Sequence, residues 1–135
     1  MALLKLLITL EIWYTSIMAK KNKIQSLAYL ASPYSHKDKK VRLQRFNAVS
    51  EAVVKLLHKG VYTFSPIAYN HPMVIYNLPT DWDFWEKYDV AFLERCDELI
   101  VLTLKGWKKS VGVNAEIEIA KKLGVKVTYL DPKDI

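Results

Sequence analysis

The chain has 135 residues, a hydrophobic fraction of 51% and a charged fraction of 25%, which excludes a disordered chain and indicates one globular domain. Its one cysteine, Cys96, excludes an internal disulfide framework and fits a reducing, cytoplasmic compartment. The net charge of +6 suits a phosphate-bearing small molecule or plain solubility, and nucleic acid is an unlikely partner because the basic residues form no long stripe.

The first 17 residues differ from the rest of the chain. They are apolar, and Lys5 and Glu11 are their only charged side chains. The segment does not match a signal peptide, because no basic region precedes the apolar run and no small-residue cleavage site follows it. It is also too short and too charged for a membrane span, so no membrane is expected as a partner. Met18 with the residues after it resembles an ordinary start of a cytosolic protein. We expect residues 1–17 to be an extension outside a single domain of residues 18–135; an amphipathic helix packed on a partner chain is the alternative.

After Met18, strand patterns and helix patterns alternate. Short apolar runs predict strands, and apolar residues at helical spacing predict helices. Gly60 and Gly124 end two helices as C-terminal caps, and Thr80 begins another with Asp83 as its capping-box partner. The predicted order is a strand at 27–31, a helix at 37–58, a strand at 61–64, a loop at 67–79, a helix at 80–96, a strand at 98–104, a loop at 105–111, a helix at 112–123 and a strand at 125–130.

This alternation is typical of an α/β fold with a doubly wound, mostly parallel sheet of the Rossmann-like or flavodoxin-like kind. The near-continuous apolar run at 98–104 predicts a strand that helices cover on both faces. Ligands of such sheets bind outside the carboxyl ends of the strands. The expected site therefore lies in the segments 32–36, 65–79 and 105–111.

Two carboxylates fall on the apolar faces of predicted helices. Asp89 and Glu116 lie within such faces, whereas Glu118 points to the polar side of its helix. An ionised carboxylate on a core-facing stripe is costly unless it lines a cavity or has partners. Each could instead be a surface acid at the edge of its stripe, satisfied by a lysine or a backbone group. Two such groups on helices that flank one apolar strand favour an acid-lined pocket.

The segment before the last helix, Lys105-Gly106-Trp107-Lys108-Lys109-Ser110-Val111-Gly112, combines lysines with a serine. Backbone N–H groups at a helix N-terminus attract anions, and the serine hydroxyl adds a donor. Ser110 can also be an ordinary N-cap, and the two roles are compatible. Glu116 follows within about one and a half turns, where the helix dipole favours its ionised form. That environment suits a nucleophilic carboxylate.

Carboxylate pairs serve glycoside cleavage, in which one carboxylate attacks the sugar carbon and an acid assists the leaving group. Glu116 as nucleophile and Asp89 as proton donor or sugar-orienting group satisfy that scheme. Tyr29, near the end of the first strand, could hold a carboxylate or be a core tyrosine. The three histidines are scattered and no Cys/His cluster has ligand spacing, so a metal site is not expected. The carboxylate chemistry described above requires no organic cofactor either.

Four segments carry a resemblance to a known family. They are Tyr-Leu-Ala-Ser-Pro-Tyr-Ser-His at 29–36, Phe-Ser-Pro-Ile-Ala-Tyr-Asn-His-Pro at 64–72, the Asp-Trp-Asp-Phe-Trp and Tyr-Asp-Val-Ala-Phe-Leu stretches at 81–93, and Gly-Trp-Lys-Lys-Ser-Val-Gly-Val-Asn-Ala-Glu at 106–116. The chain from about 27 to 132 resembles a family of uncharacterised small bacterial and phage domains. That family is similar to the nucleoside 2-deoxyribosyltransferases and the deoxynucleoside 5′-monophosphate N-glycosidases.

The resemblance implies roles for individual residues. Glu116 matches the nucleophilic glutamate, Asp89 the aspartate that handles the sugar and proton transfer, and Tyr29 the tyrosine beside the nucleophile. Ser110 and Gly112 match a turn that binds phosphate or hydroxyl groups. The transferases complete their sites with residues of a partner subunit, which implies a homodimer or a higher homo-oligomer.

Further substrate contacts are expected from the loops. Ser32 stands where the transferases more often carry glycine, and it is followed by Pro33, Tyr34 and Ser35. His71 is a base or phosphate contact, or a solvated loop histidine. Three tryptophans could stack on a nucleobase, although core packing explains the first two as well: Trp82, Trp85 and Trp107.

The predicted function is cleavage or exchange of the N-glycosidic bond of a nucleoside or nucleoside 5′-monophosphate, and the basic loop favours the monophosphate. The alternative is a nucleotide-binding or sensing module that uses the same pocket without turnover. A nucleic-acid-associated protein is the weakest interpretation, because it requires a basic stripe.

Overall fold

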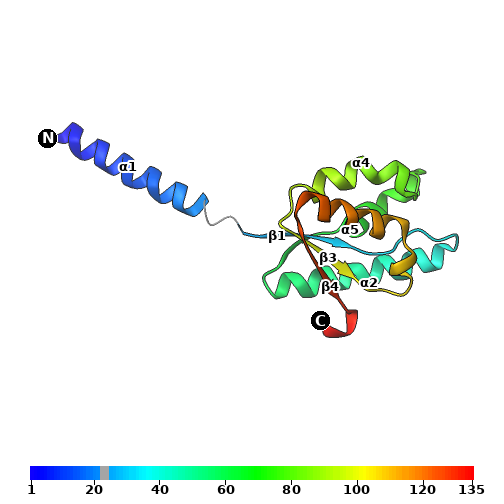
Figure 1. Ribbon diagram of the computed structural model, residues 1–135. Coiled ribbons are helices and arrows are strands. Elements are labelled where there is room, and N and C mark those ends of the chain that lie inside the picture. The colour runs from blue at the N-terminus through cyan, green and yellow to red at the C-terminus, as the bar shows by residue number, and fades with distance from the viewer. Residues whose placement is uncertain (22–24) are drawn as a thin grey trace.

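The computed structural model describes residues 1–21 and 25–135, so residues 22–24 of the predicted domain lie outside the described residues. A four-stranded sheet forms its centre (Figure 1). The strands run in the order β2-β1-β3-β4, and all of the pairs are parallel. Their bounds are β1 Leu27–Ala31, β2 Tyr62–Phe64, β3 Glu98–Leu102 and β4 Lys126–Leu130. The predicted α/β class with a parallel sheet is confirmed.

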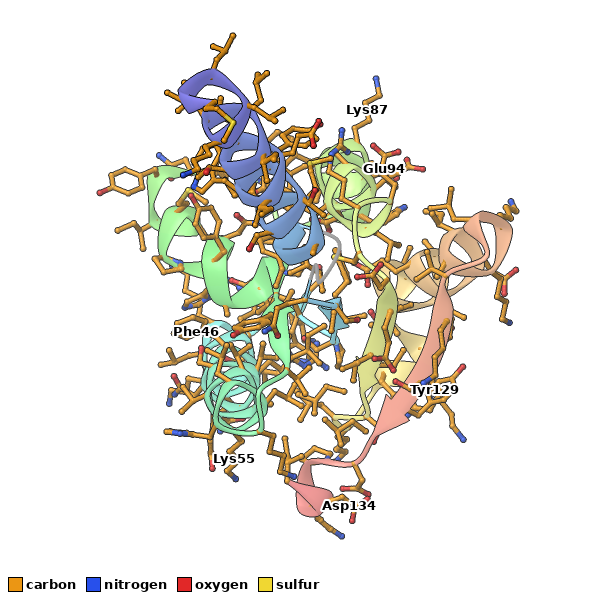
Figure 2. All side chains as sticks on the ribbon, turned by 90° about the vertical axis from the view of Figure 1, so that its left-hand side faces the viewer. Phe46, Lys55, Lys87, Glu94, Tyr129 and Asp134 are labelled. Atoms are coloured by element: carbon orange, nitrogen blue, oxygen red, sulfur yellow. The ribbon has the colours of Figure 1, made fainter. Side chains whose placement is uncertain are left out.

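Helices cover both faces of the sheet, because alternate strand residues point in opposite directions. On one face, Tyr29 and Ala31 of β1 pack with residues of α4 (Trp82–Leu93) and α5 (Val111–Leu123). On the other face, Ala28 and Leu30 pack with the buried side of α2 (Lys39–His58). Figure 2 shows α2, marked by Lys55, and α4, marked by Lys87, on these opposite sides. The sheet is therefore doubly wound.

The helix ends follow from local hydrogen bonding. Asp38 caps α2 by accepting from the N–H of Lys40, and Ser110 caps α5 by accepting from the N–H of Val113. Gly124 ends α5 with a φ of 70°, a left-handed conformation that a side chain would strain. These caps place the start of α5 beside the end of β3, at the carboxyl edge of the sheet.

Two predictions about the middle of the chain are wrong. The cap of α4 is Asp81, not Thr80, because the Asp81 carboxylate accepts from the N–H of Phe84 at 3.1 Å. The predicted loop at 67–79 contains the helix α3 (Pro66–Asn70) and the 3₁₀ helix η1 (His71–Tyr76). Single helical turns are too short to show a hydrophobic period, although Ser65-Pro66 is a cap followed by a proline at the first helical position. Two more 3₁₀ turns are η2 (Trp107–Lys109) and η3 (Pro132–Asp134).

The first 21 residues contain the helix α1 (Ala2–Lys21), which extends away from the sheet (Figure 1). Its side chains are exposed from Ala2 to Ala19. The stretch Ala2–Ala19 is long and apolar enough to cross a membrane by length and composition. The expectation that the segment is too short for such a span is therefore wrong, since the helix continues beyond residue 17.

Candidate active site

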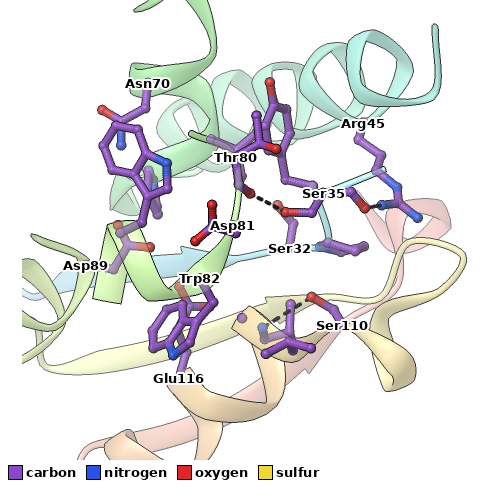
Figure 3. A pocket seen from close by; sticks show the side chains of 18 of the residues that line it. Ser32, Ser35, Arg45, Asn70, Thr80, Asp81, Trp82, Asp89, Ser110 and Glu116 are labelled. Carbon is purple, nitrogen blue, oxygen red and sulfur yellow. Dashed lines mark hydrogen bonds between the residues drawn. The ribbon is translucent and has the colours of Figure 1, made fainter. Parts of the chain in front are cut away.

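A pocket of about 410 Å³ lies at the carboxyl edge of the sheet, where doubly wound folds bind ligands. It brings together the segment after β1, the α3–η1 segment, the start and middle of α4, and the start of α5 (Figure 3). Nine of the predicted site residues line it: Ser32, Pro33, Tyr34, Ser35, His71, Asp89, Ser110, Gly112 and Glu116.

Glu116 is held by Tyr29, which lies behind the pocket wall in β1. The Tyr29 hydroxyl donates to Oε1 of Glu116 at 2.7 Å, and both side chains are buried. Burial raises the pKa of Glu116 to about 8; the charge of Asp89 also raises this pKa, and the Tyr29 hydrogen bond lowers it. Burial, then the charges of Glu116 and Asp89, raise the pKa of Tyr29 well above its usual value, so the phenol stays protonated and donates.

Asp89 faces the same pocket from α4. It is buried, its Oδ1 has no hydrogen-bond partner among the described residues, and burial raises its pKa to about 7. Since the two carboxyls also interact, they titrate as a pair. Between pH 7 and pH 8 the pair therefore holds about one proton and one negative charge, and the proton lies mainly on Glu116 because its pKa is the higher of the two. Burial thus outweighs the helix dipole, which was expected to favour the ionised form of Glu116.

The other end of the pocket is cationic. Arg45 of α2 and Lys109 of η2 line it together with Ser35 and Ser110. Nη1 of Arg45 donates to the carbonyl of Ser35 at 2.9 Å. Gly106 has a φ of 93°, and a Cβ built there would lie 3.2 Å from Nη2 of Arg45. Glycine thus lets the loop after β3 close against this guanidinium.

The sequence did not predict Arg45 as an individual site residue. It lies in the first half of α2, and no local motif marks one arginine of a helix as facing a pocket. The only signal is its place among the basic residues near the start of that helix. Only the packing of α2 beside the segment after β1 brings its charge to the site.

His71 is packed rather than solvated. Its Nδ1 is 2.6 Å from the Tyr34 hydroxyl, and the Phe46 ring stacks on it with centroids 4.2 Å apart. Burial and then the charge of Arg42 lower the pKa of His71, so the imidazole is mainly neutral at pH 7. A neutral, stacked imidazole is better suited to positioning Tyr34 than to pairing with a phosphate.

The aromatic wall comes from α4. Trp82 and Trp85 both line the pocket, and the Trp85 indole N–H donates to the carbonyl of Pro79 at 2.7 Å. A Cβ on Gly112 would be 3.5 Å from the Trp82 ring, so the start of α5 passes close to this wall. The structure places Trp107 outside the pocket, with its ring centroid 5.4 Å from that of Tyr129 on β4.

The described residues contain no group of three histidine, cysteine, aspartate or glutamate side chains that could hold a metal ion. The pocket lining contains two carboxyl groups, Asp89 and Glu116, and two cationic side chains, Arg45 and Lys109.

A family model for a domain of unknown function, DUF1937, matches residues 26–131. The chain belongs to the DUF1937 family. This match spans the sheet and the whole of the pocket. No curated protein matches the chain.

A solved structure is similar to this DUF1937 domain. It is described as a 2-deoxyribosyltransferase from the psychrotolerant bacterium Bacillus psychrosaccharolyticus, with 24% identity and a TM-score of 0.58. The similarity covers 79% of this chain and 73% of the other. The predicted resemblance to the nucleoside 2-deoxyribosyltransferases is thus confirmed at the level of the fold.

Proposed function

We propose that the protein cleaves or transfers the N-glycosidic bond of a nucleoside 5′-monophosphate. The observation that carries this proposal is the buried Tyr29–Glu116 hydrogen bond of 2.7 Å at a pocket that Asp89 also lines. A buried glutamate that faces a pocket beside a second raised-pKa carboxyl is the arrangement that glycoside chemistry uses.

The reaction proceeds in two steps. The reactive form is the minor one in which Asp89 holds the shared proton and Glu116 is ionised. In it, a Glu116 oxygen forms a bond to C1′ of the sugar while the bond from C1′ to the base nitrogen breaks, and Asp89 gives its proton to the departing base. A glycosyl ester on Glu116 results. Water or a second base then attacks C1′, Asp89 takes the proton of the attacking group, and Glu116 leaves as a carboxylate. Tyr29 stabilises the ionised form of Glu116 before attack and after release.

The cationic end of the pocket supports the monophosphate. Arg45 offers a planar set of donors for phosphate oxygens, and Lys109 adds a positive charge. The first N–H groups of α5 have no partners inside the helix, and they attract an anion. The indoles of Trp82 and Trp85 offer flat apolar surfaces for a base.

Chromatography of free base released from a panel of nucleosides and nucleoside 5′-monophosphates tests the proposal. Wild type is expected to release base, and Glu116→Gln is expected to release none. Glu118→Gln is the matched control, because Glu118 lies on the same helix but pairs on the surface with Lys121 at 3.2 Å. Base release undiminished in Glu116→Gln would remove this residue from the mechanism.

The same panel separates the enzyme from a binding module. Tight binding of a nucleotide by wild type, with no base released over hours, would favour a sensor that uses the same pocket. A mass increase of wild type by one glycosyl phosphate after acid quenching, absent from Glu116→Gln, would favour the enzyme with a covalent intermediate.

A further inference from the structure

Three buried side-chain atoms of the described residues have no hydrogen-bond partner: Oγ of Ser32, Oδ1 of Asn70 and Oδ1 of Asp89. Their residues are only 6%, 6% and 7% exposed, and all three line the pocket. A buried polar atom without a partner is costly, and native proteins keep few of them. Three at one pocket indicate groups that a bound molecule satisfies.

The other buried polar side chains of the described residues do have partners. Oγ of Ser65 accepts from the N–H of Ala68, and Glu116 accepts from Tyr29. The unsatisfied atoms are therefore confined to the pocket. They come from three elements, the end of β1, the end of α3 and the middle of α4, and Figure 3 shows Ser32, Asn70 and Asp89 around one hollow.

The chemistry of these atoms matches sugar hydroxyls. Carbonyl and carboxylate oxygens of Asn70 and Asp89 accept hydrogen bonds, and the Ser32 hydroxyl both donates and accepts. Each sugar hydroxyl also donates and accepts. A 2-deoxyribose with a phosphate on its 5′ oxygen has one free hydroxyl, whereas a ribose has two. Three unsatisfied groups are more than the single hydroxyl of the deoxy sugar can serve.

The position of Asp89 selects the hydroxyl. Asp89 and Glu116 line the same pocket, so in the proposed reaction Asp89 lies near the carbon that Glu116 attacks. The hydroxyl closest to that carbon, C1′, is the 2′-hydroxyl. Ser32 directly follows the strand that carries Tyr29.

We propose that Ser32 and Asp89 bind the 2′-hydroxyl of a ribosyl substrate, with Asn70 on the remaining hydroxyl, so that the pocket selects ribonucleotides over 2′-deoxyribonucleotides. The identification of the sugar rests on the proposed function. The selection differs from that of the similar solved structure, which is described as a 2-deoxyribosyltransferase.

Equilibrium binding to the Glu116→Gln protein tests this selection without turnover. Calorimetry with ribonucleoside and matched 2′-deoxyribonucleoside 5′-monophosphates of each base is expected to show tighter binding of the ribo form by about tenfold or more. Adding Ser32→Ala to this protein is expected to reduce the preference to about twofold or less, mainly because the ribonucleotide binds more weakly. Ser50→Ala, on α2 and outside the pocket lining, is the matched control and keeps the preference.

The melting temperature of the single Ser32→Ala variant tests whether a change in binding comes from a loss of protein stability. Because the Ser32 hydroxyl has no protein partner, removing it leaves the melting temperature unchanged or higher. A lower melting temperature, or a ribo preference that survives Ser32→Ala, would overturn the assignment of Ser32. Equal binding of the two sugars, or tighter binding of the deoxy form, would overturn the ribosyl selection and leave buried water as the partner of these atoms.

These outcomes are distinct from those of the proposed function. If base release depends on Glu116 but neither binding nor kcat/KM favours the ribonucleotide, the proposed sugar selection is wrong and the proposed glycosidase activity is supported. If binding favours the ribonucleotide in a way that depends on Ser32 but no base is released, the sugar selection is supported and the proposed activity is wrong.

Discussion

Removing the Tyr29 hydroxyl by a Tyr29→Phe substitution is expected to lower kcat/KM near pH 7 and to move the basic limb of its pH profile to higher pH. The reactive form has Glu116 ionised and Asp89 protonated, and the basic limb follows the higher of the two pKa values, that of Glu116. The hydroxyl donates to Oε1 of Glu116 at 2.7 Å, and that hydrogen bond lowers the pKa of Glu116 from what burial alone would impose. Without this hydrogen bond, the ionised form of Glu116 loses more stabilisation than the protonated form of Glu116. The proton then stays on Glu116 over a wider pH range.

The magnitude follows from the energy of one charge-assisted hydrogen bond. Such a bond contributes about 1.5–3 kcal/mol, and one pKa unit corresponds to about 1.4 kcal/mol. The pKa of Glu116 therefore rises from about 8 by roughly one to two units. At pH 7 the ionised fraction, and with it kcat/KM, falls about 10- to 100-fold.

The assay is the rate of base release from about pH 5 to about pH 10, with circular dichroism to verify the fold of the variant. Tyr129→Phe is the matched control, because this tyrosine is half exposed on β4 and lies outside the pocket lining (Figure 2). A basic limb that stays in place in Tyr29→Phe, whatever the fall in rate, would refute the assigned role of the hydroxyl. Loss of activity would then reflect packing of the ring.

Arg45→Met is expected to raise KM for nucleoside 5′-monophosphates about tenfold or more while changing KM for nucleosides little; equal effects on both would place the phosphate elsewhere. Glu116→Gln is expected to raise the melting temperature at pH 8, since the amide keeps the Tyr29 partner without a buried charge; a lower melting temperature contradicts this. Folding raises the pKa of Asp89 to about 7 and that of Glu116 to about 8, so the folded state holds the extra protons. Their contribution to the free energy of unfolding is largest below about pH 4 and is lost as the pH rises through about 7 to 8. Urea titrations measure this free energy for wild type and for the Asp89→Asn/Glu116→Gln double variant. If it falls with pH equally steeply in both proteins over that window, the expectation is wrong. Ser110→Ala removes the cap of α5 and is expected to cost about 1 kcal/mol in the same urea titrations, whereas no loss would show that the Val113 N–H finds another acceptor.

Periodicity and end signals in the sequence predict most of the architecture. The alternation of short apolar runs with amphipathic stretches predicts the parallel α/β class, and Ser110 and Gly124 mark the ends of α5 because caps act within a few residues. The sequence also singles out Asp89 and Glu116, since a carboxylate on an apolar stripe conflicts with its surroundings wherever that helix packs. Such conflicts are where functional sites are expected.

Only the tertiary structure decides which of these groups meet. Short helical turns have no period, so the sequence pattern does not reveal α3 and η1. The cap of α4 is Asp81, one residue after the predicted Thr80. Arg45 reaches the pocket because α2 packs beside the end of β1, and Tyr29 meets Glu116 across 87 residues because β1 lies under α5. Sequence patterns record the environment of one element at a time, whereas a site depends on distances between elements that packing alone determines.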